Sequence, residues 1–150
     1  MVIGVGNPYR RDDGIGPSVA AALAVPPGVA VVTCPAEPTA ILDAWDGSEV
    51  AIVVDAAVGG QPGTIRTGTL DGYVGDRPVS SHDLSLPQTY ELGRALGRAP
   101  DALVVVTVDI SDAGHGVGLS PAVAAALPVA VRLVERLVGE QAQKSGDQQP

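Results

Sequence analysis

Two kinds of apolar pattern alternate along the chain, and together they predict its strands and helices. Nearly continuous runs of β-branched residues at 29–34, 50–55 and 103–109 are typical of strands that are covered on both faces, as in parallel sheets. A similar apolar run opens the chain at residues 1–6. Residues 64–70 alternate between apolar and polar side chains instead, which indicates an edge or antiparallel strand with one face in solvent.

Segments of helical character separate these strands, at residues 17–25, 38–45 and 84–97. A last helix is predicted to begin at Pro121 with Ser120 as its N-cap, because both residue types are favoured at those positions. Apolar residues then recur every three or four positions as far as Val138, which predicts a stripe that is buried in the fold.

The predicted order is β-α-β-α-β-β-α-β-α. Such alternation favours a three-layer α/β/α sandwich around a mostly parallel sheet of five strands. We expect a single domain over residues 1–138. Residues 139–150 are expected to form a disordered tail, because they are polar and rich in Gly and Gln.

The composition indicates a folded protein and disfavours two classes of function. Of the 150 residues, 45% are apolar and only 17% are charged, which excludes a disordered protein. There is no Phe and a single Trp, so the core must be built from Val, Ala, Leu and Ile. The 17 acidic residues outnumber the 9 basic ones and give a net charge of −8. Neither nucleic-acid binding nor attraction to an anionic membrane is expected, because both depend on Lys and Arg.

The sequence also bears on the cellular compartment. The single cysteine, Cys34, excludes an internal disulfide and a zinc site built from cysteines. The N-terminus does not combine a basic region with a long apolar stretch, as a signal peptide would. No apolar run approaches the roughly 18 residues that a membrane span needs. We therefore expect a soluble cytoplasmic protein.

Acidic residues and a histidine follow the predicted strands, at the edge where such folds bind their ligands. Asp12 and Asp13 lie in the loop after the first strand, Glu37 follows the second, and Asp55 ends the third. His82 lies in the loop before the third helix. Two carboxylates and one imidazole from three separate loops would suit a first-row divalent ion and leave coordination positions open.

Each of these residues also has a simpler interpretation. Asp12 or Asp13 could cap the following helix, Asp55 could accept hydrogen bonds from loop N–H groups, and His82 could be a solvated or capping residue. A dinucleotide-binding loop is disfavoured, because Tyr9 stands where the third glycine of G-x-G-x-x-G would be. Two carboxylates at the start of the helix would also repel a pyrophosphate.

Other candidate residues carry weaker signals. Cys34 has no local signature of a nucleophile and is expected to be a small apolar filler. His115, between two glycines, is expected to be a mobile loop residue. Glu37 could add a carboxylate to the site. The motifs H-E-x-x-H and G-x-S-x-G are absent, which excludes a helical zincin and the usual α/β-hydrolase.

Four motifs, taken in order, resemble those of the hydrogenase maturation endopeptidases, the nickel-dependent proteases that trim the large subunit of NiFe hydrogenases. The resemblance covers roughly residues 2–138. The motifs are Ile3-Gly4-Val5-Gly6-Asn7 with Asp12-Asp13-Gly14-Ile15-Gly16, Val53-Val54-Asp55-Ala56 with Pro62-Gly63-Thr64, Ser81-His82 with Leu84, and Gly118-Leu119-Ser120-Pro121 with Val123. Each motif alone is modest evidence for the family, but the four motifs together, in this order and at family-like distances, are specific to it.

The resemblance implies a twisted five-stranded sheet flanked by helices. It places the family's metal-contacting residues on Asp13, Asp55 and His82, which are expected to be both the metal ligands and the catalytic residues. It implies that nickel arrives already bound in the large-subunit precursor, where it marks a correctly loaded substrate. Cutting a short C-terminal extension then lets the subunit close around the metal. Other divalent ions are expected to occupy the site in vitro, and the family expectation is a monomer.

Several alternatives stay open. Family members often carry a glycine-rich stretch with Thr after the second strand, and its replacement at residues 34–39 suggests a distinct hydrogenase subgroup. The nickel could polarise the scissile carbonyl, lower the pKa of a water, or serve only as an assembly check with Asp13 as the general base. A non-catalytic metal- or precursor-binding chaperone on the same fold would bind the precursor without changing its mass. A nucleotide-binding module is disfavoured by the acidic strand ends.

Overall fold

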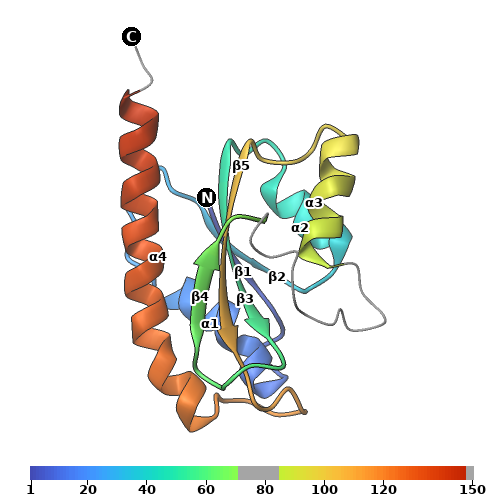
Figure 1. Ribbon diagram of the computed structural model, residues 1–150, viewed down its shortest axis with the longest axis vertical. Coiled ribbons are helices and arrows are strands. Elements are labelled where there is room, and N and C mark those ends of the chain that lie inside the picture. Colours follow the sequence, from blue (N-terminus) through green and yellow to red (C-terminus); the bar gives the residue numbers. More distant parts are fainter. Residues whose placement is uncertain (71–84, 148–150) are drawn as a thin grey trace.

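The computed structural model describes residues 1–70 and 85–147, and there it forms a five-stranded sheet with helices on both faces (Figure 1). In chain order the elements are β1 (Val2–Val5), the 3₁₀ turn η1 (Arg11–Gly14), α1 (Ile15–Ala22), β2 (Val31–Cys34), α2 (Pro38–Trp45), β3 (Val50–Ala57), β4 (Ile65–Gly68), α3 (Leu86–Ala95), β5 (Ala102–Asp109) and α4 (Pro121–Asp147). The strand order is β2-β1-β3-β5-β4, and among these described strands only β4 pairs antiparallel, at one edge. The predicted fold class and the antiparallel edge strand are confirmed.

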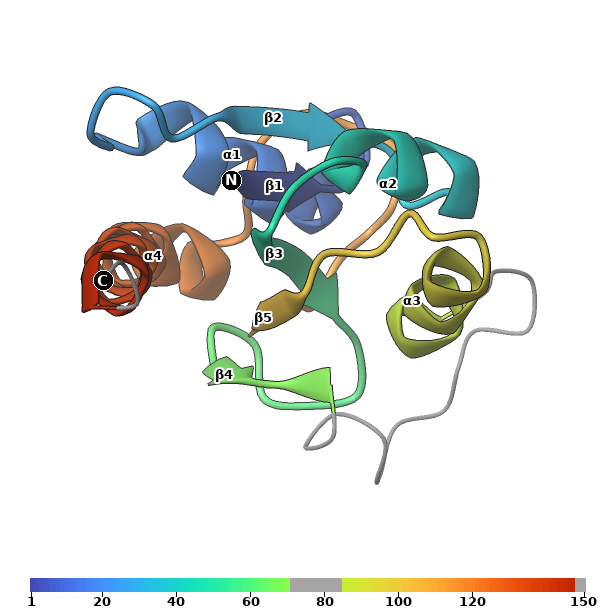
Figure 2. The ribbon, with the colours of Figure 1, turned by 90° about the horizontal axis from the view of Figure 1, so that it is seen from above.

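Helices α1 and α4 cover one face of the sheet, and α2 and α3 cover the other (Figure 2). Successive residues of a strand point alternately to the two faces of the sheet and pack into the two cores. In β3, Ile52 and Val54 pack toward α1 and α4, whereas Ala51 and Val53 pack toward α2 and α3. A strand that is covered on both faces needs apolar residues at every position, which explains the uninterrupted β-branched runs.

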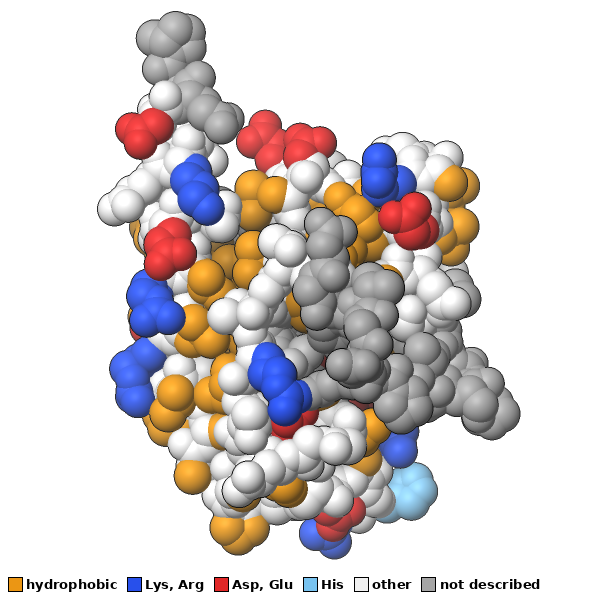
Figure 3. Space-filling model, viewed as in Figure 1, with side chains coloured by type: hydrophobic (Ala, Val, Ile, Leu, Met, Phe, Trp, Pro, Cys, Tyr) orange, Lys and Arg blue, Asp and Glu red, His pale blue; other side chains and the backbone are white. Residues whose placement is uncertain are grey.

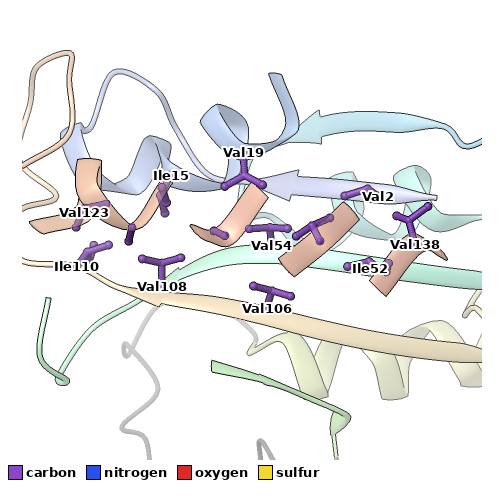
Figure 4. Packing of buried hydrophobic residues seen from close by; sticks show 13 residues of the cluster. Val2, Ile15, Val19, Ile52, Val54, Val106, Val108, Ile110, Val123 and Val138 are labelled. Atoms are coloured by element: carbon purple, nitrogen blue, oxygen red, sulfur yellow. The ribbon is translucent and has the colours of Figure 1, made fainter. Parts of the chain in front are cut away.

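The two cores are filled without any phenylalanine. Between the sheet and α1 with α4, the buried side chains are Val, Ile and Ala, including Ile15 and Val19 of α1 (Figure 4). On the other side Trp45 is fully buried and meets the ring of Tyr90 edge-on, with ring centroids 6.1 Å apart. Small aliphatic residues thus fill the first core, and the second combines aliphatic residues with one large aromatic residue.

Two glycines of the first motif allow α1 to lie directly on the sheet. A Cβ atom on Gly4 would run into the backbone of Gly16, and one on Gly16 would run into the carbonyl oxygens of Val5 and Val54. These glycines therefore serve close helix–strand packing, which accounts for the glycine pattern without a phosphate ligand.

The C-terminal segment differs from its prediction. Residues 139–147 do not form a disordered tail, because α4 continues through them to Asp147 and extends past the edge of the sheet (Figure 1). Val138 is the last buried residue of the helix, so burial does not hold the extension in place. Its Gln, Ala, Glu and Lys residues are good helix formers, and this propensity outweighs the polar composition that favoured disorder.

The surface carries interspersed charges. On the face shown in Figure 3, acidic and basic side chains are interspersed along α4. Arg136 and Glu140, one turn apart on α4, form an ion pair at 3.9 Å. None of the helices within residues 1–70 and 85–147 is both long and apolar enough to cross a membrane.

Candidate active site

The carboxyl ends of β1, β2 and β3 lie side by side and form one row of residues. In the parallel register, Gly4 pairs with Val54 and Val5 pairs with Cys34. Asp55 is one residue further along β3 and is therefore level with Val5, with β1 between Asp55 and Cys34. This row faces the α2–α3 side of the sheet, because Val5 packs into the core on that side.

Asp13 lies in η1, the turn that leads into α1. Its half-buried carboxylate accepts a hydrogen bond from the N–H of Asn7 at 2.8 Å. Asn7 Oδ1 in turn accepts the N–H of Tyr9 at 2.9 Å, which closes the loop after β1. The N-cap of α1 is Gly14, which has no side chain to cap the helix, so neither Asp13 nor Asp12 caps α1. The asparagine of the first motif thus shapes the loop that holds Asp13.

Asp55 is half-buried at the end of the row and accepts the N–H of Ala56 at 2.8 Å. Burial raises the pKa of Asp55 to about 7, because the ionised form loses its hydration. The hydrogen bond from Ala56 opposes this rise, and the negative charge of Asp13 adds to it. The two carboxylates are thus close enough for their charges to interact.

Cys34 occupies the other end of this row. Burial raises the pKa of its thiol to about 11, and the negative charge of Asp55 adds to the rise. A reactive cysteine needs the opposite surroundings, which favour the thiolate. These surroundings agree with the small apolar filler that the sequence predicts.

The sequence and the fold match those of one family. The model of the hydrogenase maturation protease family matches residues 17–137. This chain belongs to that family. It is therefore an endopeptidase of hydrogenase maturation, as the resemblance of the four motifs implied. No curated protein sequence matches the chain.

Solved structures of such proteases have the same fold. The hydrogenase maturating endopeptidase HybD from Escherichia coli superposes with a TM-score of 0.79 at 25% identity, over 93% of this chain and 91% of that chain. An endopeptidase from Escherichia coli gives a TM-score of 0.76 at 22% identity, over 94% of this chain and 93% of the other. The NiFe hydrogenase maturation protease HycI from Thermococcus kodakarensis gives 0.68 at 20% identity, over 92% and 90%.

Within this protease, the other sequence candidates have different environments. Asp12 points away from solvent and is fully buried, with its carboxylate bonded to the loop at residues 111–120. Glu37 is exposed at the N-cap position of α2, where its side chain makes no capping hydrogen bond. His115 is exposed, and its carbonyl oxygen accepts a hydrogen bond from Nε of Arg11 at 3.3 Å. His82 lies outside the described residues, so its role stays a prediction.

The sequence alone did not single out a second acidic strand end in this protease. Asp109 ends β5, is fully buried and forms an ion pair with Arg66 of β4, with Nη1 of Arg66 3.1 Å from Oδ2 of Asp109. The sequence feature that could have identified Asp109 is the one that identified Asp55, an aspartate at the end of a β-branched run. Its basic partner lies 43 residues earlier in the chain, and no local pattern links the two.

The arrangement of Asp13 and Asp55 has two chemical uses. Two carboxylates that repel each other in a half-buried place favour either a proton or a cation between them. A carboxyl group with a pKa of about 7 can also give or take a proton near neutral pH. Among residues 1–70 and 85–147 no cluster of three or more His, Cys, Asp and Glu side chains suits a metal ion. A third protein ligand would have to come from elsewhere in the chain.

Proposed function

We propose that this protease removes a C-terminal extension from a nickel-loaded precursor of the NiFe hydrogenase large subunit. In this proposal Asp13, Asp55 and His82 contact the nickel that the precursor carries, so the ion belongs to the substrate. The observation that carries the proposal is the placement of two half-buried carboxylates, Asp13 in η1 and Asp55 in β3, at the carboxyl edge of the sheet. Burial raises the pKa of Asp55 to about 7, and the charge of Asp13 adds to this rise.

The donor set fits such a substrate. Asp13 and Asp55 supply carboxylate oxygens from two different elements, η1 and β3. A divalent ion would offset the repulsion between them and favour the ionised form of Asp55. A neutral imidazole from His82 would complete a three-ligand set with open positions for the ligands that the substrate brings. Other divalent ions would bind the same donors in vitro.

In this proposal Asp13 and Asp55 have different roles in the cleavage reaction. Nickel held there would supply positive charge, which polarises a carbonyl group or lowers the pKa of a water. Asp13, which accepts a hydrogen bond from the N–H of Asn7, would act as the general base toward the attacking water. Asp55 orients the metal-bearing segment. We further propose that the protease acts as a cytoplasmic monomer.

The test is a processing assay followed by intact mass spectrometry. Nickel-loaded and nickel-free precursor are each incubated with the wild-type protease, and only the loaded precursor is expected to lose the mass of the extension. Asp13→Asn, Asp55→Asn and His82→Gln are expected to lower the processing rate at least about 100-fold, the scale of a general acid–base contribution. Asp101→Asn is the matched control, because Asp101 is exposed just before β5, at the opposite edge of the sheet. Full processing by all three site variants would overturn the site assignment, and an unchanged precursor mass with the wild type would favour the chaperone hypothesis.

A further inference from the structure

The row of residues at the strand ends continues across the whole sheet. Asp55 of β3 pairs with Thr107 of β5, and Thr107 pairs with Arg66 of β4. Laterally paired residues of a sheet point to the same face. Arg66 therefore shares the face and the level of Asp55, two strands away. Adjacent strands lie about 4.8 Å apart, so the two backbones are roughly 10 Å apart along this row.

The carboxylate of Asp109 holds the guanidinium of Arg66 in place. Its Nη1 lies 3.3 Å from Oδ1 and 3.1 Å from Oδ2 of Asp109, whose side chain is fully buried. Asp109 lies two residues beyond Thr107 on β5 and so on the same face. The ion pair therefore directs Arg66 toward the carboxyl edge of the sheet.

Arg66 also remains accessible. Its side chain is 52% exposed, although its partner Asp109 is 0% exposed. Both contacts to Asp109 use one nitrogen, whereas a guanidinium has five N–H donors in a rigid fork. A buried carboxylate that fixes an exposed arginine lowers the entropy that this arginine loses when it binds a second acceptor.

We propose that Arg66 is a substrate-binding residue, whose guanidinium donates hydrogen bonds to a carbonyl or carboxylate oxygen of the precursor chain beside the bond that is cut. The inference rests on the proposed function. Asp13 and Asp55 offer acceptors to the substrate, and a peptide segment that lies along this edge also presents acceptors of its own. Arg66 supplies a fixed donor in the same row.

The experiment measures steady-state processing of nickel-loaded precursor by two variants. Arg66→Lys keeps the charge opposite Asp109 but loses the fork, and the double variant R66Q/D109N removes both charges, so that no buried carboxylate is left without its cation. Both are expected to raise KM about tenfold, the scale of one hydrogen bond to a charged group, with kcat within about threefold of the wild type. Thermal unfolding of R66K is expected to stay near that of the wild type, which separates substrate binding from a structural role.

Arg98→Gln is the matched control. Arg98 is also held by carboxylates, with Nη2 2.6 Å from Oδ1 of Asp43 and Nε 3.3 Å from Oδ2 of Asp46, but it follows α3 at the opposite edge of the sheet. The KM of the Arg98→Gln variant is expected to equal that of the wild type. An unchanged KM in both Arg66 variants would overturn the inference, and so would a fall in kcat alone. Failure of the wild type to process the precursor would overturn the proposed function instead.

Discussion

Asp12 is fully buried and Asp55 half-buried at the carboxyl edge of the sheet, yet their surroundings shift their pKa values in opposite directions. Asp12 accepts hydrogen bonds from the N–H and the hydroxyl of Ser120 at 2.6 and 2.8 Å. It also accepts bonds from the N–H and hydroxyl of Ser111 and from the N–H of Asp112. Burial alone would raise its pKa, but these donors outweigh burial and lower it. Asp55 is bonded to the N–H of Ala56, and its pKa rises to about 7.

The difference lies in the number of donors that the fold directs at each carboxylate. Asp12 is a structural anion that ties η1 to the loop at residues 111–120, and the backbone bonds between Arg11 and Gly116 and between Tyr9 and Gly116 strengthen the same junction. Within residues 1–70 and 85–147, Asp55 accepts a hydrogen bond only from the N–H of Ala56, which leaves part of its hydrogen-bonding capacity for a ligand. A carboxylate saturated by the fold stabilises the protein, whereas a carboxylate short of donors can bind a proton or a cation.

The largest expected effect comes from removing the structural anion. Asp12→Ala removes the fully buried carboxylate that accepts the N–H groups of Ser111, Asp112 and Ser120, and should lower the free energy of unfolding by about 3 kcal/mol or more. Urea denaturation measures this loss. Asp112→Ala is the control in the same loop, because its ion pair with Arg11 is half-exposed and contributes under about 1 kcal/mol. Equal losses in the two variants would contradict the assigned role of Asp12.

Asp55→Asn should act in the opposite direction. A folded-state pKa raised to about 7 adds stability that is fully present below the ordinary pKa near 4 and is lost as pH rises through 7. At pH 8 the wild type therefore holds a half-buried charge that Asn lacks. The variant is expected to be about 1–2 kcal/mol more stable than the wild type at pH 8, with little difference at pH 4. A variant that is less stable at pH 8 would show that the fold stabilises ionised Asp55.

The pH dependence of the Asp12 variant separates the two carboxylates further. Because the pKa of Asp12 is lowered, its contribution is fully present above the ordinary pKa near 4 and is lost as pH falls through the folded-state pKa. The stability difference between the wild type and Asp12→Asn should be constant from pH 8 to 5. It should shrink as pH falls below 4. Denaturation at each pH gives the curve, and a difference that is flat down to pH 2 would speak against an ionised Asp12.

The same contrast shows what the sequence can predict. The order of strands and helices follows from local patterns, because a β-branched run that is covered on both faces has few alternative structures. Asp12 and Asp13 are adjacent, however, and successive residues of a 3₁₀ turn point in different directions. Which of them faces the site depends on Ser111 and Ser120, which come about 100 residues later. Only the folded chain brings these donors to Asp12.

Two further features differ from what the local pattern predicts, for opposite reasons. The ion pair of Arg66 with Asp109 joins strands that are antiparallel neighbours, and the alternating pattern of residues 64–70 predicted the edge strand but not the partner of its arginine. The helical extension to Asp147 was missed for the opposite reason, since local propensity prevailed where the polar composition indicated disorder. The positions of Asp13 and Asp55 after strands predict that the two lie close together, because the carboxyl ends of parallel strands meet at one edge of the sheet.

A bound metal ion is expected to distinguish the two carboxylates directly. If the two half-buried carboxylates favour a cation, Ni²⁺ or Cd²⁺ at about ten times its dissociation constant should stabilise the wild type by about 1.4 kcal/mol. Asp55→Asn should lose most of this gain, whereas Asp101→Asn, at the opposite edge of the sheet, should keep it. Thermal unfolding with and without the ion measures the shift, and a chelator should reverse it. An equal shift in Asp55→Asn would mean that the ion binds elsewhere. Only the pH dependence of stability would then distinguish Asp55 from Asp12.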